Sequence, residues 1–343
     1  MKFVNRSKAS RTGGTSLHAV AAMIIGLSLL GRPVAAIAQE TVSPRVQDTG
    51  MVVTLLGTGT PLLSARRFGF SNIVQAGPLT LMFDAGRGSA IRLGQLGIPV
   101  GRIDALFLTH FHSDHVVGLP DIFMTGYLGL KSLGGRQTPL QVYGPTGTKP
   151  LIDGIRQAFS ADAKIRHNDE KLSFDAMPIV AHEFEVGVVF EQSGVKVTAF
   201  EVDHGEHIKP SIGYQVDYGG NAVVFSGDTR HSENLISKSQ NADLIIHEMA
   251  AAPSETNGNP VYQKILGHHT SPEEAGDVFA RVKPAMAVYS HAGRLAGPTG
   301  VPSWGEIIKR TRKNYSGPLI IGEDLMQFFI SENTVAIAVG GAD

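Results

Sequence analysis

The chain contains no cysteine among its 343 residues. Disulfide bonds, thiolate metal ligands and a cysteine nucleophile are therefore excluded, so a metal site would have to use histidine, aspartate or glutamate. The chain also lacks a large excess of positive or negative charge. The formal net charge is −1, so no overall field draws the protein to nucleic acid or to an anionic membrane. Hydrophobic residues make up 42% of the chain and charged residues 18%, which is typical of a globular protein with a sizeable core.

The chain also lacks an apolar run long enough to span a membrane. Residues 17–30 are mostly apolar but short, they follow a basic lead, and Ala36-Ile37-Ala38 matches a small-residue cleavage site. This pattern predicts a signal peptide over residues 1–38, cut near Ala38-Gln39, and a polar linker over residues 39–50. The mature protein is then periplasmic or secreted, if the source is a bacterium, with no stable membrane insertion. An uncleaved anchor is the alternative. The leader contains no Arg-Arg pair, so the sequence does not support export by the twin-arginine route.

Residues 109–115 form the most informative segment. They hold three histidines and one aspartate, directly after the apolar run of residues 105–108. Neutral imidazole and carboxylate are the ligands that hold zinc and similar divalent metals. A buried strand that ends in such a loop predicts a site for two metal ions. The alternative is a solvated polar loop, but such loops rarely concentrate histidine so heavily.

Short apolar strands followed directly by polar residues recur along the chain. Strands dominate its first and middle parts, with helices between them, which predicts a mixed α/β layered protein. Neighbouring strands place their ends along one rim of a sheet, so the residues after them can converge on one site. The residues in these positions are His110, His204, Asp228, His247 and His291.

A series of short motifs occurs in a fixed order from about Val52 to the C-terminus. In this order the chain resembles the metallo-β-lactamase superfamily, and most of all its ribonuclease Z and arylsulfatase-like branch. The resemblance implies a four-layer αββα sandwich over residues 51–343, with a di-metal site at one edge of the two sheets. The motifs are Leu56-Gly57-Thr58-Gly59, Phe83-Asp84-Ala85-Gly86, residues 110–115, Gly144-Pro145, His204-Gly205, Gly213-Tyr214, Ser226-Gly227-Asp228-Thr229, His247-Glu248, His269 and His291.

The resemblance implies a ligand set for two divalent metal ions. Zinc is the expected ion for a set so rich in histidine, with manganese or iron as alternatives. A water bridging two cations loses a proton near neutral pH and becomes a hydroxide nucleophile, which Asp114 could orient. His207 competes with His204, which we prefer because it directly follows a strand. The implied ligands are His110, His112 and His204 for one metal, Asp114, His115 and His291 for the other, and Asp228 as the bridge.

The resemblance also implies roles for residues beside the ligands. His269 is similar to the histidine that donates a proton to the leaving group in ribonuclease Z enzymes. Its neighbour His268 is an alternative, and a simple helix-entry histidine is another. His247 and Glu248 would support the site from behind, with Glu248 orienting a ligand or the proton donor. Asp84 would act in the same way or would simply close a turn.

The expected substrate is a small ester. Ribonuclease Z enzymes carry a long arm that grips transfer RNA, whereas here only a short hairpin separates Gly213-Tyr214 from Ser226. No strong basic patch is present elsewhere, which disfavours a nucleic-acid partner. We therefore expect an exported hydrolase of a phosphodiester or an aryl sulfate. The alternatives are a lactonase or β-lactamase-like acyl hydrolase, RNA processing, and a non-catalytic metal-binding protein.

Two helices and the oligomeric state complete the expectations. Ser271 and Glu274 form a capping-box pattern that predicts a helix ending at Val282. In a helix over residues 121–130, Ile122-Phe123-Met124 could wall a pocket for an aromatic leaving group or belong to an ordinary core helix. Related enzymes are often dimers, so the resemblance allows a homodimer, but the sequence carries no interface signature and does not give the oligomeric state.

Overall fold

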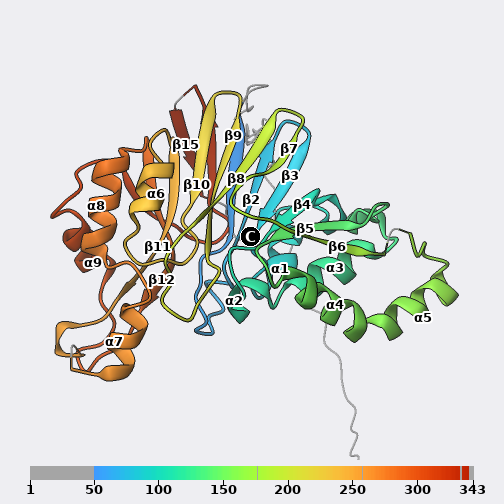
Figure 1. The fold of residues 1–343 in the computed structure, drawn as a ribbon, viewed down its shortest axis with the longest axis horizontal. Helices are drawn as coiled ribbons and strands as arrows, with labels where there is room; N and C mark the ends of the chain where they lie inside the picture. The colour runs from blue at the N-terminus through green and yellow to red at the C-terminus, as the bar shows by residue number, and fades with distance from the viewer. Residues whose placement is uncertain (1–49, 176, 257, 333, 340–343) are drawn as a thin grey trace, which may run out of the picture. The chain divides into compact units, whose positions relative to one another are not determined.

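Figure 1 shows two β-sheets with helices beside them. The structure is a computed structural model, and it describes residues 50–339 apart from residues 176, 257 and 333. The predicted signal peptide and the predicted linker, except Gly50, lie outside the described residues. All described residues belong to one compact unit, Pro44–Asp343.

The first sheet has eight strands within the described residues, in the order β15-β14-β1-β2-β3-β4-β5-β6. The pairs from β15 to β3 are antiparallel, and those from β3 to β6 are parallel. Its strands are β1 (Met51–Gly57), β2 (Ser71–Ala76), β3 (Leu79–Phe83), β4 (Ala105–Phe107), β5 (Leu140–Gly144), β6 (Ile179–Glu183), β14 (Gln327–Ser331) and β15 (Thr334–Ala338).

The second sheet has seven strands in the same described part of the chain, in the order β13-β12-β11-β10-β9-β8-β7. The pairs from β13 to β10 are parallel, and those from β10 to β7 are antiparallel. Its strands are β7 (Gly187–Gln192), β8 (Val195–Glu201), β9 (Ile212–Tyr218), β10 (Asn221–Phe225), β11 (Leu244–Ala251), β12 (Met286–Arg294) and β13 (Leu319–Ile321).

Helices cover the outer face of each sheet (Figure 1). The helices beside the first sheet are α1 (Ser89–Gln95), α2 (Ser113–Val116), α3 (Leu119–Tyr127), α4 (Thr148–Ala158) and α5 (Ser160–Glu170). Those beside the second are α6 (Glu233–Lys238), α7 (Pro260–Leu266), α8 (Pro272–Val282) and α9 (Trp304–Thr311). The capping box of α8 is confirmed: the Glu274 amide donates to Ser271 Oγ, and the Ser271 amide donates to Glu274 Oε2. The two sheets, with helices beside each of them, confirm the predicted four-layer αββα sandwich.

The described residues form three apolar cores, and the alternation of side chains along the strands separates them. Alternate residues of a strand face opposite sides, so Leu81 and Phe83 of β3 pack between the sheets while Met82 packs under the helices. Between the sheets, Phe83 stacks on Phe107 and Phe225 with ring centroids 5.0 and 4.6 Å apart. The third core joins the second sheet to α6, α8 and α9. Truncating a fully buried ring such as Phe107 to alanine would destabilise the fold by about 3–5 kcal/mol.

Two strands continue past their predicted ends. We expected strands to stop before His247 and His291, but β11 runs on to Ala251 and β12 to Arg294. A register shift between His247 and Met249 and a positive φ of 48° at His291 turn the two strands locally without ending their pairing. Polar residues inside a paired strand interrupt the apolar pattern, which is why the sequence suggested an end there.

The predicted helix over residues 121–130 is displaced, since α3 spans Leu119–Tyr127 and ends earlier than expected. The helix α5 was not expected at all. It has no buried residue, so its sequence lacks the apolar stripe that marks a packed helix. In residues 50–339, outside the three undescribed positions, we find no helix with the length and hydropathy needed to cross a bilayer.

Candidate metal centre

All seven predicted ligands come together where β4, β8 and β10 end. The ligand atoms of each of two groups of these residues lie within 4.8 Å of one another, and a third such group joins His269 to Asp228 and His291. The first group is His110, His112, His204 and Asp228; the second is Asp114, His115 and His291. All of them are buried except His112, which is exposed. His207 is exposed and belongs to neither group, so the structure places His204, not His207, among the ligand candidates.

Asp228 lies between the two groups. Its Oδ2 is 3.7 Å from His204 Nε2 and 3.4 Å from His115 Nε2. Its Oδ1 is 3.5 Å from His291 Nδ1. The carboxylate thus faces members of both groups, which is the geometry that the predicted bridging role requires.

Asp84 fixes the orientation of two histidines. Its Oδ2 lies 2.8 Å from His115 Nδ1 and also accepts the Thr109 hydroxyl, while its Oδ1 accepts the Thr109 amide. The Thr109 oxygen in turn lies 2.9 Å from His110 Nδ1. Because Nδ1 of both histidines carries the donated hydrogen, the lone pair of each Nε2 is directed into the site. Asp84 therefore supports the ligands, as one of its two interpretations predicted.

His204 is oriented from another direction. Its Nδ1 donates to the backbone carbonyl of His268 at 2.8 Å, which leaves the Nε2 lone pair facing Asp228. The helix α7 precedes His268 in the chain, so a segment about sixty residues downstream of His204 sets its ring. His268 contributes this carbonyl, and its half-buried ring packs beside Gly205.

The donor set fits divalent cations. Three buried side-chain atoms of the site, His115 Nε2, Asp228 Oδ1 and His291 Nδ1, have no hydrogen-bond partner among the described residues. An unsatisfied buried polar atom is unfavourable by about 1–3 kcal/mol, so three in one place indicate a ligand that they share. Imidazole and carboxylate donors together suit zinc and its first-row neighbours.

The electrostatics of the site keep most ligands in a metal-binding form. Burial holds the pKa of His110 well below its usual range and lowers that of His204 to about 4, so both rings are neutral. Burial alone would raise the pKa of Asp228, but His291 and His115 hold it well below its usual range. His115 shows the opposite balance. Burial alone would lower the pKa of His115, but Asp228 and Asp84 raise it well above its usual value.

His269 lies beside the ligands and is held by Glu248. Glu248 Oε2 is 2.9 Å from His269 Nδ1, and Oε1 accepts the Thr270 amide. The His269 ring is 4.9 Å from that of His204 and 5.9 Å from that of His291. Burial alone would lower the pKa of His269, but Glu248 raises it to about 9. This arrangement suits a proton donor.

His247 does not join the cluster. Its Nδ1 bonds to the Glu248 carbonyl, and its ring packs edge-on against Phe279 of α8 at 5.6 Å. It therefore faces the helix layer, and the predicted supporting role falls to Glu248. A one-residue step along a strand reverses the side-chain direction, so adjacent strand residues cannot both face the site.

Two residues at the site were missed by the sequence reasoning. Thr109 relays the hydrogen bond of Asp84 to His110. Phe70 packs against the rings of His115 at 5.2 Å and His291 at 5.5 Å, and so shields one side of the centre. The position of Thr109 at the start of the histidine segment was a usable signal, whereas nothing in the sequence singles out Phe70.

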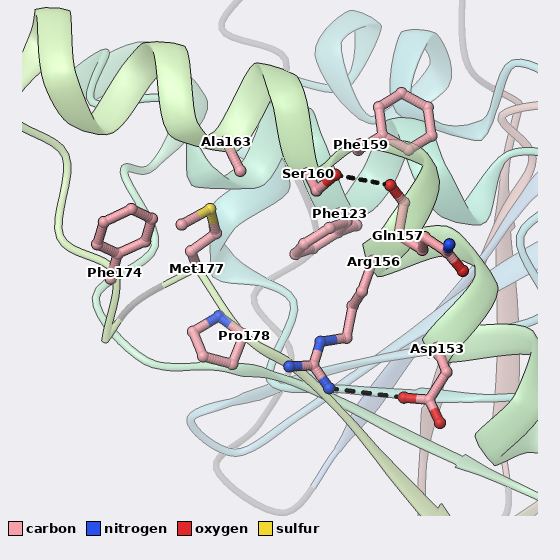
Figure 2. Close-up of a pocket in the computed structure, with 10 residues that line it drawn as sticks. All are labelled: Phe123, Asp153, Arg156, Gln157, Phe159, Ser160, Ala163, Phe174, Met177 and Pro178. Carbon is pink, nitrogen blue, oxygen red and sulfur yellow. Dashed lines mark hydrogen bonds and ion pairs between the residues drawn. The ribbon is translucent and has the colours of Figure 1, made fainter.

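The helix α3 belongs to a core. Ile122, Phe123 and Tyr127 are buried under the first sheet. Phe123 also lines a pocket of about 400 Å³ beside α4 and α5, together with Phe174, Met177 and Pro178 (Figure 2). None of the residues that line this pocket is a ligand candidate. The core-helix interpretation of Ile122-Phe123-Met124 is therefore preferred to a wall of the reaction site.

Comparison with known proteins decides the family. The model of the "Beta-lactamase superfamily domain" matches residues 80–292, which contain the histidine segment, Asp228 and His291. The chain belongs to the metallo-β-lactamase superfamily. It is 30% identical over 296 residues to the ribonuclease Z of Mycolicibacterium gilvum, which covers 84% of this chain and 99% of that protein.

Solved structures agree on the superfamily fold. The metallo-β-lactamase fold protein YhfI from Bacillus subtilis superposes with a TM-score of 0.63 at 19% identity, covering 82% of this chain and 99% of the other. The short form of human tRNase Z gives a TM-score of 0.59 at 23% identity, covering 82% and 98%. Together with the ligand clusters, the family shows that the chain is a metal-dependent hydrolase of ester bonds that binds divalent metal.

Proposed function

We propose that this metallo-β-lactamase superfamily protein is an exported hydrolase of a small phosphodiester or aryl sulfate that uses two zinc ions. One observation carries the proposal. His269, held by Glu248, lies beside two adjoining groups of ligands that share Asp228. A cation pair suits an anionic ester, and a nearby acid suits an ester whose leaving group needs a proton.

The chain's own residues would divide the work as follows. Bound in the two groups, divalent cations would supply Lewis-acid activation of water and neutralise charge on the ester oxygens. Asp84, directly and through Thr109, keeps the lone pairs of His115 and His110 aimed into the site. Asp114, whose Oδ2 lies 3.0 Å from His291 Nε2, would orient the attacking water. His269 would give its proton to the departing oxygen, and Glu248 would hold the resulting neutral ring in place.

RNA cleavage is the second candidate because curated relatives are named ribonuclease Z. The structure joins β9 to β10 by a tight turn in which Tyr218 pairs with Asn221, so no arm projects between these strands. That hairpin and the formal net charge of −1 both favour a small substrate over a long RNA. Export, predicted from residues 1–38, would also separate the enzyme from transfer RNA.

One substrate panel tests the proposal. Zinc-loaded protein from a single batch would be assayed with bis(p-nitrophenyl) phosphate, p-nitrophenyl sulfate, an aromatic lactone, a cephalosporin and a precursor transfer RNA. We expect turnover of the phosphodiester or the sulfate to exceed that of the others by at least about a hundredfold in kcat/KM. Preference for RNA, lactone or cephalosporin would overturn the substrate assignment. Hydrolysis of none by fully loaded protein would support a non-catalytic metal-binding protein.

Export has a separate test. We expect that the protein, expressed from its full sequence in a bacterium, is recovered in the periplasm or the medium with Gln39 at or near its N-terminus. Recovery of full-length protein in the cytoplasm would contradict export and leave the hydrolase assignment unaffected.

A further inference from the structure

A second pocket, of about 650 Å³, lies outside the metal centre. Its walls come from the loop after β1, the end of β12, the start of α9 and the segment before β14. Four arginines and two carboxylates line it, which leaves two positive charges unmatched. A concave surface with an excess of guanidinium groups is suited to an anionic ligand.

Two of these arginines stack on the chain's only tryptophan. The guanidinium of Arg294 lies 4.1 Å from the Trp304 ring centroid, and that of Arg67 lies 5.1 Å from it. Arg294 donates from Nη1 to the Pro302 carbonyl, and Arg67 donates from Nη1 to Gly322 O and Thr58 Oγ1. In the part of the chain that the structure describes, neither forms an ion pair with a carboxylate. Each therefore keeps N–H groups for an external oxyanion.

The carboxylates of the pocket form no ion pair with Arg67 or Arg294, although burial lowers the pKa of Arg67, and Asp324 and Glu323 raise it. Asp324 Oδ2 pairs with Arg92 Nη2 at 2.8 Å and accepts the Phe68 amide, while Oδ1 accepts the Thr58 amide and hydroxyl. Every oxygen of Asp324 is thus in use, and the pair is almost completely buried. Glu323 is exposed to solvent, where its charge is screened.

Two of the chain segments that line this pocket continue to residues at the metal centre. Arg294 lies three residues after His291 on β12, and Arg67 lies three residues before Phe70, whose ring packs on His291. One substrate would occupy both places if its ester lay at the metal ligands and its other end lay at Arg294.

We propose that Arg294 and Arg67, stacked on Trp304, form a specificity site for an oxyanion on the part of the substrate that is not cleaved. This proposal rests on the proposed function, because it names the class of substrate: a small ester that carries a second anionic group, such as a carboxylate, sulfate or phosphate. Arg294 makes the selective contact, since it donates to one protein acceptor, Pro302 O, whereas Arg67 donates to both Gly322 O and Thr58 Oγ1.

The kinetic test uses two phosphodiesters with the same p-nitrophenol leaving group. The second ester group is p-carboxyphenyl in one and its methyl ester in the other. We expect wild type to prefer the carboxylate by about tenfold in kcat/KM, mainly through KM. Arg294→Gln should reduce this ratio to about one, Arg294→Lys should restore part of it, and the exposed Arg102→Gln should keep it. A wild-type ratio near one, or a ratio that Arg294→Gln does not change, would overturn the proposal.

A binding test separates this proposal from the proposed function. Trp304 is the only tryptophan in the chain, so tryptophan fluorescence reports occupancy of the pocket directly. In metal-loaded full-length protein, benzoate, benzenesulfonate or phenyl phosphate should change the emission saturably, and neutral benzamide should not. Arg294→Gln should abolish the change. No response to any of the three anions would overturn the site, whereas a response in protein that hydrolyses neither diester would contradict only the proposed function.

Discussion

Asp84 Oδ2 lies 2.8 Å from His115 Nδ1, and both side chains are completely buried. The same carboxylate reaches His110 through Thr109, so one residue at the end of β3 orients a ligand from each of the two groups. Asp84 adopts a positive φ of 58°, which disfavours residues other than glycine. The backbone strain is consistent with a position set by the site.

Asp84→Asn should weaken metal binding. An amide nitrogen cannot accept from His115 Nδ1, so the tautomer that presents Nε2 to the site loses its support. We expect the affinity for zinc to fall by about 10–100-fold, measured by competition with a chelator of known affinity. Asp104→Asn is a matched control, because Asp104 also accepts a backbone amide but lies at the far end of β4. Unchanged zinc affinity in Asp84→Asn would show that Asp84 only closes a turn.

His112→Ala should lower both metal content and turnover. His112 is exposed, so its removal should not disturb the core, and the first group keeps only His110, His204 and Asp228. We expect the zinc content, measured by plasma mass spectrometry after dialysis, to fall from two to about one per chain. His207→Ala removes an equally exposed histidine and should keep both ions. Two ions per chain in His112→Ala would refute the ligand assignment.

His269→Ala should slow poor leaving groups selectively. A departing oxygen of high basicity needs a proton, and His269, held by Glu248, lies beside the ligands. Across a series of aryl phosphodiesters we expect kcat to fall about a hundredfold for the most basic phenolate and less than about tenfold for p-nitrophenolate, with zinc content unchanged. His268→Ala, at the alternative position, should show no such dependence. Equal slowing across the series would contradict a proton donor at position 269.

Glu273 should contribute to stability in a pH-dependent way. It accepts hydrogen bonds from Arg310 and Lys313, and these partners lower its pKa from 4.5 to about 2 although burial opposes the shift. A carboxylate with a lowered pKa stabilises the folded state above its unfolded pKa, and this contribution disappears as the pH falls from 4.5 towards 2. After allowance for solvent screening, we expect Glu273→Gln to lower the free energy of unfolding by about 1 kcal/mol at pH 7.

Urea unfolding at several pH values between 7 and 3 measures this effect. The difference between wild type and Glu273→Gln should shrink below pH 4.5, and the exposed Glu185→Gln should show little difference at any pH. A difference that stayed constant down to pH 3 would mean that Glu273 acts through packing and not through its charge.

The sequence predicted the ligand candidates because metal chemistry restricts residue type and position together. His110, His204 and Asp228 follow short apolar strands, and the topology of such sheets brings those ends to one rim. The layered α/β class followed from the same alternation of strands and helices. The resemblance then assigned the remaining ligands, and the structure places all of them in two adjoining groups.

Features that depend on side-chain direction or on distant backbone could not be predicted. Whether His247 or Glu248 faces the site is decided by the register of β11, which a single-residue shift reverses. The carbonyl of His268 that orients His204, and the approach of Arg67 to Trp304, join segments far apart in the chain. Local patterns carry no information about such pairs.

Anomalous diffraction at the zinc absorption edge, on crystals of the zinc-loaded protein, tests the central claim most directly. The account predicts two peaks per chain. One lies among His110, His112 and His204, the other among Asp114, His115 and His291, and Asp228 lies between them. A single peak, or two peaks of which neither contacts Asp228, would contradict the shared centre on which the proposed hydrolysis depends.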